Sequence, residues 1–595
     1  MTGQAPNPAV IAAIEAQTRV NTCLDNSRSF RLEAGAGAGK TYSLVEVLKK
    51  LIAERGEKML RNGQQVACIT FTEVARDEIL QDIEQHPAIL VETIHAFSWS
   101  VMSQFQKPLR ELVAALPDRQ PKIDEGGGLN DKPIEYQLGF FGVEADRVTL
   151  SHDDIPRFMA QLLEKKKFRD ILTQQYPVIL IDEYQDTDKH FMTALTTHFL
   201  QPGEGPLIGL FGDHWQTIYR GDYELLELPN VEGIDKGSNF RSVPAIVDVL
   251  NALRPELRQE VSEPDAIGEA RFFHTNSYTG ERTNTAHSKE DLPDDIARQY
   301  RDALTAKLQS EGWEITPDST KYLMLTHNAL AAEQGYPSIA KIFKRNEAFA
   351  KKEDPTIAFL ADVLEPMFRA YERRCYGEMF RLIKSGPKLT GHADKTRWRK
   401  DMDLLRDLRL TGSIGGVLDH LKATQRPRLP DRIMRREEEL SAAKVQEEAA
   451  EDQDAAAVDG EDTAEDVSSS TARHRQLREV RYTEVIELVK FLDGDTTFAT
   501  QHSVKGAEFE NVVVILGGGW NHYNWPRLLE LIQTQALTAK NAKGYFRARN
   551  LFYVSISRPK VRLAVLATQT LTHLALQGAT KLFGTENVAV LNLPE

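Results

Sequence analysis

The sequence predicts an α/β protein built on two parallel sheets, on the strength of two sets of short apolar segments and one glycine-rich loop. In the first set, apolar segments alternate with helix-like segments and lie at residues 29–33, 66–71, 178–181 and 206–211. The second set lies at residues 322–326, 496–500, 512–516 and 561–566. Strands that alternate with helices form parallel sheets covered on both faces, and such sheets bind ligands at the carboxyl ends of their strands.

Two long segments interrupt these sets and are expected to form mostly helical inserted subdomains. Residues 103–170 separate the second and third strands of the first set, and residues 352–479 interrupt the second set. Within the later insertion, residues 447–466 contain ten acidic and no basic side chains. We expect residues 447–470 to form a disordered acidic loop, because this Ala/Asp/Glu/Ser-rich composition cannot bury a core.

The composition is that of a globular protein. The 595 residues suggest about four folding units, at roughly 150 residues per domain. The net charge of −14 looks unfavourable for binding nucleic acid, but the acidic segment accounts for ten of these charges. A local basic groove is compatible with the nearly balanced remainder, so the net charge neither supports nor excludes a nucleic-acid partner.

The cysteine spacing and the absence of a recognisable signal peptide or membrane-spanning segment indicate the expected cellular location. The cysteines Cys23, Cys68 and Cys375 show no metal-site spacing and fit a reducing compartment. No signal peptide and no apolar run of the roughly 20 residues that span a bilayer is visible. We therefore expect a soluble, cytoplasmic protein without a membrane partner.

A phosphate-binding loop follows the first strand and precedes a helix expected from Thr41 to Leu51. Its backbone N–H groups would cradle phosphate oxygens, Lys40 would contact the β- and γ-phosphates, and Thr41 would bind magnesium. A chance Gly/Ala turn is the alternative, disfavoured by the flanking strand and helix. The loop consists of Ala34, Gly35, Ala36, Gly37, Ala38, Gly39, Lys40 and Thr41.

An acidic pair ends the third apolar segment. Asp182 would hold magnesium, directly or through water, and Glu183 would orient the attacking water as a catalytic residue. An Asp-Glu pair alone is commonly a solvated strand end. Together with the phosphate loop it predicts hydrolysis of ATP with Mg²⁺ as cofactor.

The segment Asp182–Thr187 resembles the acidic box of superfamily 1A DNA helicases of the UvrD/Rep/PcrA type. Six further boxes occur in that family's order, at residues 70–78, 93–97, 212–219, 239–242, 500–509 and 551–558. The resemblance implies two RecA-like domains with ATP in the cleft between them. Domain 1A would comprise residues 1–102 and 171–235, domain 2A residues 236–351 and 480–595, and the insertions 103–170 and 352–479 would form subdomains 1B and 2B.

The resemblance also implies roles for residues around the nucleotide. Gln216 would sense the γ-phosphate, and Arg241 and Arg558 would reach the γ-phosphate across the cleft as catalytic arginines, with surface salt bridges as the alternative. At the nucleoside, Gln17 would read adenine, Phe240 would stack on it and Glu508 would contact the sugar. Ordinary surface is the alternative for Gln17, and a core position is the alternative for Phe240.

Single-stranded or tailed duplex DNA is the partner that the resemblance implies. The family's motif III aromatic is missing, because Tyr219 is followed at once by Arg220-Gly221. Trp215 and Tyr219 are the nearest replacements for stacking on a base, while a packed Trp215 is the alternative. The candidate DNA contacts are Phe71, Thr72, Thr93, His95, Trp215, Tyr219 and His502.

Two functions compete at this point. The first is an ATP-dependent DNA translocase or helicase that moves 3′ to 5′, a direction given by the family alone. The second is an ATP-gated, DNA-sensing regulatory subunit of a nuclease-based antiphage complex, since compact UvrD-like chains without a nuclease resemble the helicase partners of OLD-family nucleases in Gabija-like systems. A P-loop ATPase without nucleic acid is a third reading, opposed by the boxes at residues 70–78, 93–97 and 500–509.

Overall fold

The structure is a computed structural model, and the chain divides into two compact units. The first unit comprises residues 1–272, 523–563 and 571–589, and the second comprises residues 273–522, 564–570 and 590–595. The expected domain boundary lay at residue 235, whereas this division also places residues 236–272, 523–563 and 571–589 in the first unit. The structure describes residues 7–137, 141–218, 227–285, 288–325, 327–343, 349–350, 352–383, 391–451, 464–518 and 522–594.

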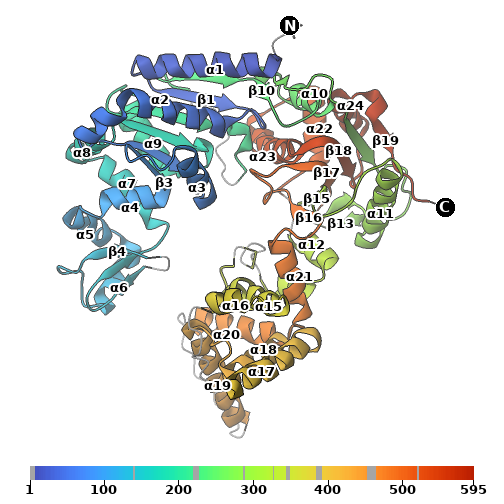
Figure 1. Cartoon of the computed structure of the whole chain (residues 1–595). Coiled ribbons are helices and arrows are strands. Elements are labelled where there is room, and N and C mark those ends of the chain that lie inside the picture. The colour runs from blue at the N-terminus through green and yellow to red at the C-terminus, as the bar shows by residue number, and fades with distance from the viewer. Residues whose placement is uncertain are drawn as a thin grey trace. The chain divides into compact units, whose positions relative to one another are not determined.

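The first unit is organised around a six-stranded sheet of order β3-β2-β7-β8-β1-β9. Figure 1 labels β1 and β3 of this sheet. All five neighbouring pairs run parallel. Every residue of β1, β2, β7 and β8 is buried, as expected for strands covered on both faces. The strands are β1 (Phe30–Ala34), β2 (Val66–Thr70), β3 (Ile89–Thr93), β7 (Val178–Asp182), β8 (Leu207–Gly212) and β9 (Glu232–Lys236).

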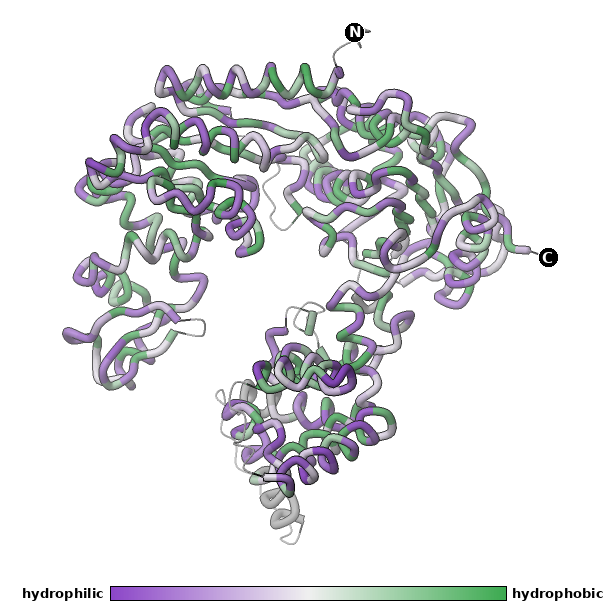
Figure 2. The backbone as a smooth tube through the Cα atoms, in the orientation of Figure 1, coloured by the Kyte–Doolittle hydropathy of each residue, from purple (hydrophilic) through white to green (hydrophobic). Residues whose placement is uncertain are grey.

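Helices on this sheet carry the phosphate loop and the expected motifs. α1 packs against β9 and β1, and α2 packs against β8. Hydrophobic and hydrophilic residues alternate along α1, as the hydropathy-coloured tube shows (Figure 2). The helices of this part are α1 (Pro8–Asp25), α2 (Lys40–Arg61), α3 (Glu73–Asp82), α4 (Ile94–Met102) and α9 (Lys189–Leu195), with a π-helical turn η3 (Thr196–Leu200) and 3-10 turns η2 (Tyr184–Asp186) and η4 (His214–Gln216).

The segment between α4 and β7 forms the first insertion. It is mostly helical, as expected, but it also contains a three-stranded sheet of order β4-β6-β5 that the sequence patterns did not predict. These strands have only two or three residues each, too few for an alternating pattern to be recognised. The elements are α5 (Gln106–Ala114), η1 (Pro117–Arg119), α6 (Gln120–Glu125), β4 (Ile134–Tyr136), β5 (Gly142–Val143), β6 (Val148–Leu150), α7 (Asp154–Leu163) and α8 (Lys166–Gln175).

A second six-stranded sheet has the order β16-β15-β17-β18-β12-β19. The pairs β15–β16 and β15–β17 are parallel, so the predicted α/β class with two large parallel sheets is confirmed. The sequence patterns missed β12 and β19. The strands are β12 (Glu269–His274), β15 (Thr320–Met324), β16 (Phe498–Thr500), β17 (Phe509–Leu516), β18 (Pro559–Ala567) and β19 (Val588–Val590).

Shorter elements complete the two units. In the first unit, α22 packs against both α23 and α24. The first unit contains β10 (Ser238–Asn239), α10 (Pro244–Leu253), η5 (Pro255–Leu257), β11 (Glu260–Val261), α22 (Trp525–Thr534), α23 (Ala539–Ile556), α24 (His573–Phe583) and η7 (Thr585–Asn587). The second unit contains β13 (Thr283–Asn284), β14 (Lys289–Asp291), α11 (Asp294–Ser310), α12 (His327–Gln334) and α13 (Pro337–Ile342).

The second unit also contains a helical insertion with its own apolar core. At the expected acidic loop 447–470, α19 continues to Glu451 and α20 begins at Ala464, because Ala and Glu are strong helix formers; residues 452–463 lie outside the described residues. No helix in the described residues has the length and apolarity to cross a membrane. The insertion contains α14 (Pro355–Phe359), η6 (Leu360–Leu364), α15 (Glu365–Glu372), α16 (Tyr376–Leu382), α17 (His392–Thr411), α18 (Ile414–Thr424), α19 (Asp431–Glu451), α20 (Ala464–Glu479) and α21 (Thr483–Leu492).

Candidate functional site

The predicted phosphate loop connects β1 to α2 in the first unit. Gly37 and Gly39 adopt left-handed backbone angles, with φ of 79° and 72°. Residues with a Cβ atom rarely adopt this conformation, so glycine is needed at both positions. α2 begins directly after Gly39, which places its N-terminal amide groups at the end of the loop.

Lys40 lies between the two predicted acidic residues at the end of β7. Its Nζ is 3.5 Å from Asp182 Oδ1, and it also forms an ion pair with Glu183. Burial alone would lower the pKa of Lys40, but Asp182 and Glu183 outweigh burial and raise that pKa above its ordinary value. The first turn of α2 and the end of β7 therefore meet, as the two motifs predict.

Asp182 has the features of a cation ligand. It is buried, its Oδ1 accepts no hydrogen bond from the described residues, and the Lys40 ammonium lies 3.5 Å from that oxygen. Burial raises the pKa of Asp182, which Lys40 opposes. Thr41 follows on the first turn of α2 and is half-buried. A carboxylate and a hydroxyl are oxygen ligands of the kind that Mg²⁺ prefers, so these residues fit that ion.

Glu183 has a left-handed backbone with φ of 49°, a conformation that costs roughly 1–3 kcal/mol in a residue other than glycine. Its carboxylate accepts a hydrogen bond from Gln185 Nε2. Gln185 Oε1 in turn accepts from the backbone N–H of Asp213 at 3.1 Å. Asp213 Oδ2 accepts from Gln216 Nε2 at 2.9 Å, so a chain of hydrogen bonds links the predicted catalytic Glu183 to the predicted sensor Gln216.

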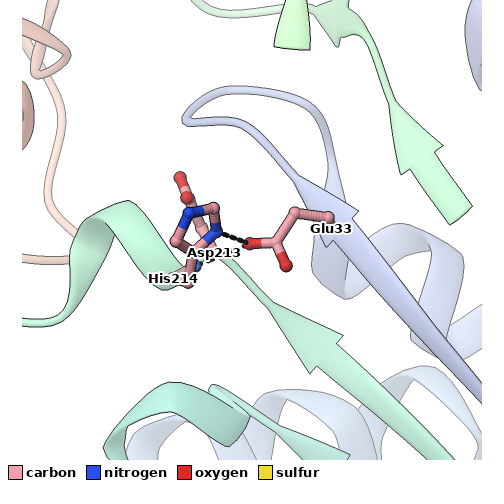
Figure 3. Close-up of side chains that lie close together, drawn as sticks. All are labelled: Glu33, Asp213 and His214. Carbon is pink, nitrogen blue, oxygen red and sulfur yellow. Dashed lines mark hydrogen bonds and ion pairs between the residues drawn. The ribbon is translucent and has the colours of Figure 1, made fainter. Parts of the chain in front are cut away.

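The buried carboxylate of Glu33, on β1, connects the segment after β7 to the segment after β8. Glu33 accepts hydrogen bonds from the Tyr184 hydroxyl at 2.8 Å and from the His214 backbone N–H at 2.6 Å. The His214 ring contacts the same carboxylate, as Figure 3 shows. Sequence reasoning missed Glu33, although two charged residues, Arg31 and Glu33, in the strand before the loop were a visible signal.

Glu33, Asp213 and His214 place ligand atoms close enough together to hold a metal ion. A guanidinium already compensates their charge, because Arg254 NH1 is 2.7 Å from Asp213 Oδ1 and Arg254 NH2 is 3.8 Å from Glu33. Burial alone would lower the pKa of Arg254, but Asp213, Tyr553 and Glu33 together outweigh burial and raise that pKa. The cluster is therefore an internal ion-pair network, and Arg254 is a second residue that the sequence motifs did not reveal.

Helix α23 brings the last predicted motif to the phosphate loop within the first unit. The backbone N–H of Ala36 donates to the Tyr553 hydroxyl at 3.0 Å. Arg558, at the C-terminal end of this motif, is 1% exposed. Burial, and then the nearby Arg241, lower the pKa of Arg558 to about 9. Arg241 donates to the Ser557 carbonyl at 3.1 Å, so the two predicted catalytic arginines lie close together.

The two residues predicted to contact adenine are also in the first unit. Phe240 is 46% exposed, so its core interpretation is wrong. A Cβ atom placed on Gly39 would lie 3.8 Å from the Phe240 ring, which puts this ring beside the phosphate loop. Gln17 donates to Asn21 at 3.4 Å, while its Oε1 is buried and accepts no hydrogen bond from the described residues. An exposed ring and an unsatisfied amide oxygen fit a purine base.

Four of the predicted DNA contacts lie at the ends of β2 and β3. Phe71 is 48% exposed and available for stacking. The hydroxyls of Thr72 and Thr93 accept hydrogen bonds from the backbone N–H groups of Ala75 and Ala96 as helix N-caps. His95 stacks on His152 with ring centroids 3.5 Å apart.

Trp215 requires a correction. It is 4% exposed, with Arg549 and Arg254 lying 3.6 Å and 5.1 Å from its ring and Tyr553 meeting it edge-on at 5.5 Å. A side chain covered in this way offers no face for a DNA base. The alternative interpretation of a packed ring fits the structure, because the aromatic and cationic neighbours supply partners that a sequence pattern cannot locate.

Tyr219 and His502, predicted to contact DNA, and Glu508, predicted to contact the nucleotide sugar, complete the predicted site residues. Tyr219 lies outside the described residues. His502 and Glu508 belong to the second unit, where both lie between β16 and β17. His502 is half-buried and Glu508 is exposed.

Comparison with known proteins identifies the same region. Residues 17–222 match the family model described as AAA domain. The chain is 23% identical to the Gabija protein GajB of Bacillus cereus (strain HuB5-5), over 92% of this chain and 94% of that protein. It is 27% identical to the RecBCD enzyme subunit RecB of Chlamydia pneumoniae over 18% of this chain and 11% of that protein.

A further relative is one of the subunits of the ATP-dependent helicase/nuclease of Natranaerobius thermophilus, 25% identical over 26% of this chain and 13% of that protein. The last two similarities are confined to a small part of each chain, whereas the similarity to GajB extends over nearly the whole length of both proteins. Residues 17–222 are therefore an AAA domain of the UvrD-like helicase family, carried by a chain that is similar over most of its length to the Gabija protein GajB.

Proposed function

We propose that this chain is an ATP-dependent DNA translocase of the helicase type, which hydrolyses ATP at the phosphate loop and moves 3′ to 5′ along single-stranded DNA. The observation that carries the proposal is the position of Lys40 against Asp182 and Glu183, with Asp182 Oδ1 unsatisfied among the described residues. A lysine paired with two carboxylates at the end of a glycine loop is an arrangement that a nucleotide-bound cation can enter.

Mg²⁺ would be held by Thr41 and Asp182, and when bound it would neutralise charge on the phosphate oxygens. Lys40 would then exchange its carboxylate partners for phosphate oxygens. Glu183 would orient the attacking water, held in place by the amide of Gln185. The strained backbone of Glu183 supports this role, because such conformations cluster at functional sites.

Gln216, Arg241 and Arg558 would respond to the γ-phosphate. The hydrogen-bond chain through Gln185 and Asp213 connects Gln216 to Glu183, so a movement of either side chain would displace the other. Arg241 and Arg558 are two neighbouring cations, one of them with a lowered pKa. A polyphosphate anion would relieve that repulsion, and this is the charge that stabilises phosphoryl transfer.

The DNA strand would pass over Phe71, Thr72, Thr93 and His95 of the first unit. His502 of the second unit is proposed separately as a DNA contact. Stacking on an exposed aromatic ring and contact with phosphates suit binding without sequence preference. The 3′-to-5′ direction rests on the likeness to the UvrD-like helicases.

A second candidate function is favoured by the similarity to the Gabija protein GajB over 92% of this chain. In this alternative, ATP and DNA occupancy would control a separate nuclease subunit of an antiphage defence complex, and the chain would unwind DNA weakly by itself. The same nucleotide site would serve either function.

The experiment is an ATPase assay of the purified chain with and without a single-stranded oligonucleotide, alongside unwinding of duplexes with 3′ or 5′ overhangs. The translocase proposal expects stimulation by the oligonucleotide and strand displacement from the 3′ overhang. Stimulated hydrolysis without displacement from either overhang would favour the regulatory alternative. Absence of hydrolysis under all conditions would reject both.

A further inference from the structure

One short segment of the first unit supplies a donor to each of the four carbonyls from Ala36 to Gly39 in the phosphate loop. Ala36 O accepts from Gln259 Nε2 at 3.0 Å and from Asn239 Nδ2 at 3.2 Å. Each of the other three carbonyls accepts from one group of this segment: Phe240 N at 2.9 Å from Gly37 O, Ser238 Oγ at 3.1 Å from Ala38 O and Lys236 Nζ at 2.9 Å from Gly39 O. We call these five donors the carbonyl brace. Gly39 O also accepts from the Ser43 backbone N–H at 3.2 Å within α2.

The brace has a physical reason. A loop that turns its N–H groups inward toward phosphate must turn its carbonyls outward, and buried carbonyls need donors. Parallel pairing of β9 with β1 places Lys236 opposite Ala34, next to the start of the loop. The brace therefore holds the loop in shape from the side opposite its N–H groups.

Lys236 differs from the other donors because it carries a charge. It is 1% exposed, and besides Gly39 O its Nζ donates to Ser43 Oγ at 2.8 Å. Among the described residues Lys236 has no carboxylate within ion-pair distance, and burial lowers its pKa to about 8. Charged groups on the neighbouring segments do not offset this lowering: Arg19, Glu33, Lys40, Glu46, Arg241 and Glu260.

The Lys236 ammonium lies beside Gly39, the residue that precedes Lys40. A Cβ atom placed on Gly39 would lie 3.6 Å from Lys236 Nζ. A buried ammonium ion without a carboxylate partner is unfavourable until an anion approaches it. The phosphate loop, whose Gly39 carbonyl Lys236 contacts, is the site where the proposed function places an anion.

We propose that Lys236 is a second lysine of the nucleotide site, a positioning residue that holds Gly39 and supplies buried positive charge to the polyphosphate of a nucleoside triphosphate. This inference rests on the proposed function, because it takes the phosphate loop as the site that binds ATP. Lys236 touches the loop rather than the nucleotide, so its effect on the phosphates passes through space and through the conformation of Gly39.

A consequence is coupling between nucleotide binding and protonation. Near pH 8, part of the nucleotide-free protein has a neutral Lys236, because its pKa is about 8. A bound polyphosphate stabilises the ammonium form and raises this pKa, so binding takes up a proton from solvent. Affinity for ATP therefore falls as the pH rises through about 8, and uptake disappears near pH 6, where Lys236 is already protonated.

The test compares wild type with Lys236→Met in titrations of ATP, ADP and AMP by calorimetry at pH 8, in two buffers of different ionisation enthalpy. We expect wild type to take up protons, and we expect Lys236→Met to lose this uptake. The affinity loss should grow with phosphate number, from about tenfold or more for ATP to a few-fold for AMP, because the lost term is electrostatic.

Two controls separate charge from shape. Ser238→Ala removes an uncharged brace donor and should weaken the three nucleotides equally. Lys321→Met removes a buried lysine on β15 of the second unit, which donates to the Gly494 carbonyl at 2.8 Å, and should leave nucleotide affinity unchanged.

The outcomes are distinct. Equal loss for all three nucleotides, or none, would overturn the role of Lys236 while the ATP site stands. Absence of proton uptake by wild type at pH 8 would also overturn it, even if the variant fails to fold. Failure of wild type to bind ATP would instead reject the proposed function.

Discussion

The phosphate site of the first unit and the helical insertion of the second unit both bury charged side chains, but they treat charge differently. In the helical insertion, Arg409 forms two hydrogen bonds with Glu365, whose carboxylate also accepts from the Tyr482 hydroxyl at 2.9 Å. Burial alone would lower the pKa of Arg409, but Glu365 outweighs it and raises that pKa. The same insertion pairs Glu437 with His474 and Arg478.

At the phosphate site carboxylates still raise the pKa of Lys40, but the balance is reversed at two other cations. Burial lowers the pKa of Arg558 to about 9 and that of Lys236 to about 8, and no carboxylate outweighs burial at either group. Asp182 keeps one oxygen without a hydrogen bond from the described residues. Ion pairs that stabilise a fold compensate charge within the chain, whereas a site that binds an anion and a cation leaves charge to be compensated by its ligands.

The largest effect is expected from Lys40→Ala. Because Lys40 is the charge proposed to move from the carboxylates to the phosphates, its loss should reduce ATP hydrolysis by at least about 10³-fold. Phosphate release measures the loss, and thermal unfolding should show that the variant remains folded. Lys50→Ala, on the same helix, is the matched control and should retain activity. Normal turnover by Lys40→Ala would contradict the phosphate-site assignment.

Arg558→Ala should lower turnover by about 10³-fold, as for other arginines that stabilise phosphoryl transfer, while nucleotide affinity changes little. Single-turnover hydrolysis and equilibrium binding separate the two quantities. A parallel loss of affinity and rate would instead place Arg558 with Arg409 among the residues that hold the fold. That result would remove the distinction drawn between the two regions.

Arg409→Met tests the buried ion pair in the helical insertion of the second unit. Removing one partner of a buried pair leaves Glu365 uncompensated and should destabilise the protein by about 3–5 kcal/mol. Hydrolysis per folded molecule should not change. The double variant Arg409→Met/Glu365→Met should recover stability in urea denaturation. A specific loss of ATPase activity at unchanged stability would show that the insertion participates in the reaction.

The smallest effect concerns His95. Burial, followed by the nearby His152, lowers the pKa of His95 to about 4. A histidine with a lowered pKa in the folded state binds fewer protons than in the unfolded state. Its contribution to stability is therefore lost as the pH falls from about 6.5 through 4. His95→Gln should flatten the fall of melting temperature in this range. If His95 also contacts DNA, the variant should bind an oligonucleotide more weakly at pH 7.5, where the His95 and Gln side chains are both neutral. Unchanged binding would show that His95 is a purely structural residue.

Local chemistry made much of the site predictable. A glycine loop followed by Lys-Thr, and an acid pair after an apolar strand, are patterns of adjacent residues, and parallel strands bring their carboxyl ends to one edge. The structure accordingly brings Lys40 to Asp182 and Glu183. Strands of two or three residues, such as β5, were not predictable because their hydrogen bonds come from the partner strand rather than from their own sequence.

The sequence by itself determined the α/β class, the phosphate loop and the acidic pair, because each depends on neighbours along the chain. Tertiary structure alone decided that Trp215 packs against Arg254 and Arg549 instead of facing solvent. It also placed Glu33 against Tyr184 and His214, and Lys236 behind Gly39. Glu33 and Lys236 are each separated from these partners by 150 or more residues in the sequence. The charge state of a buried group depends on what surrounds it in space.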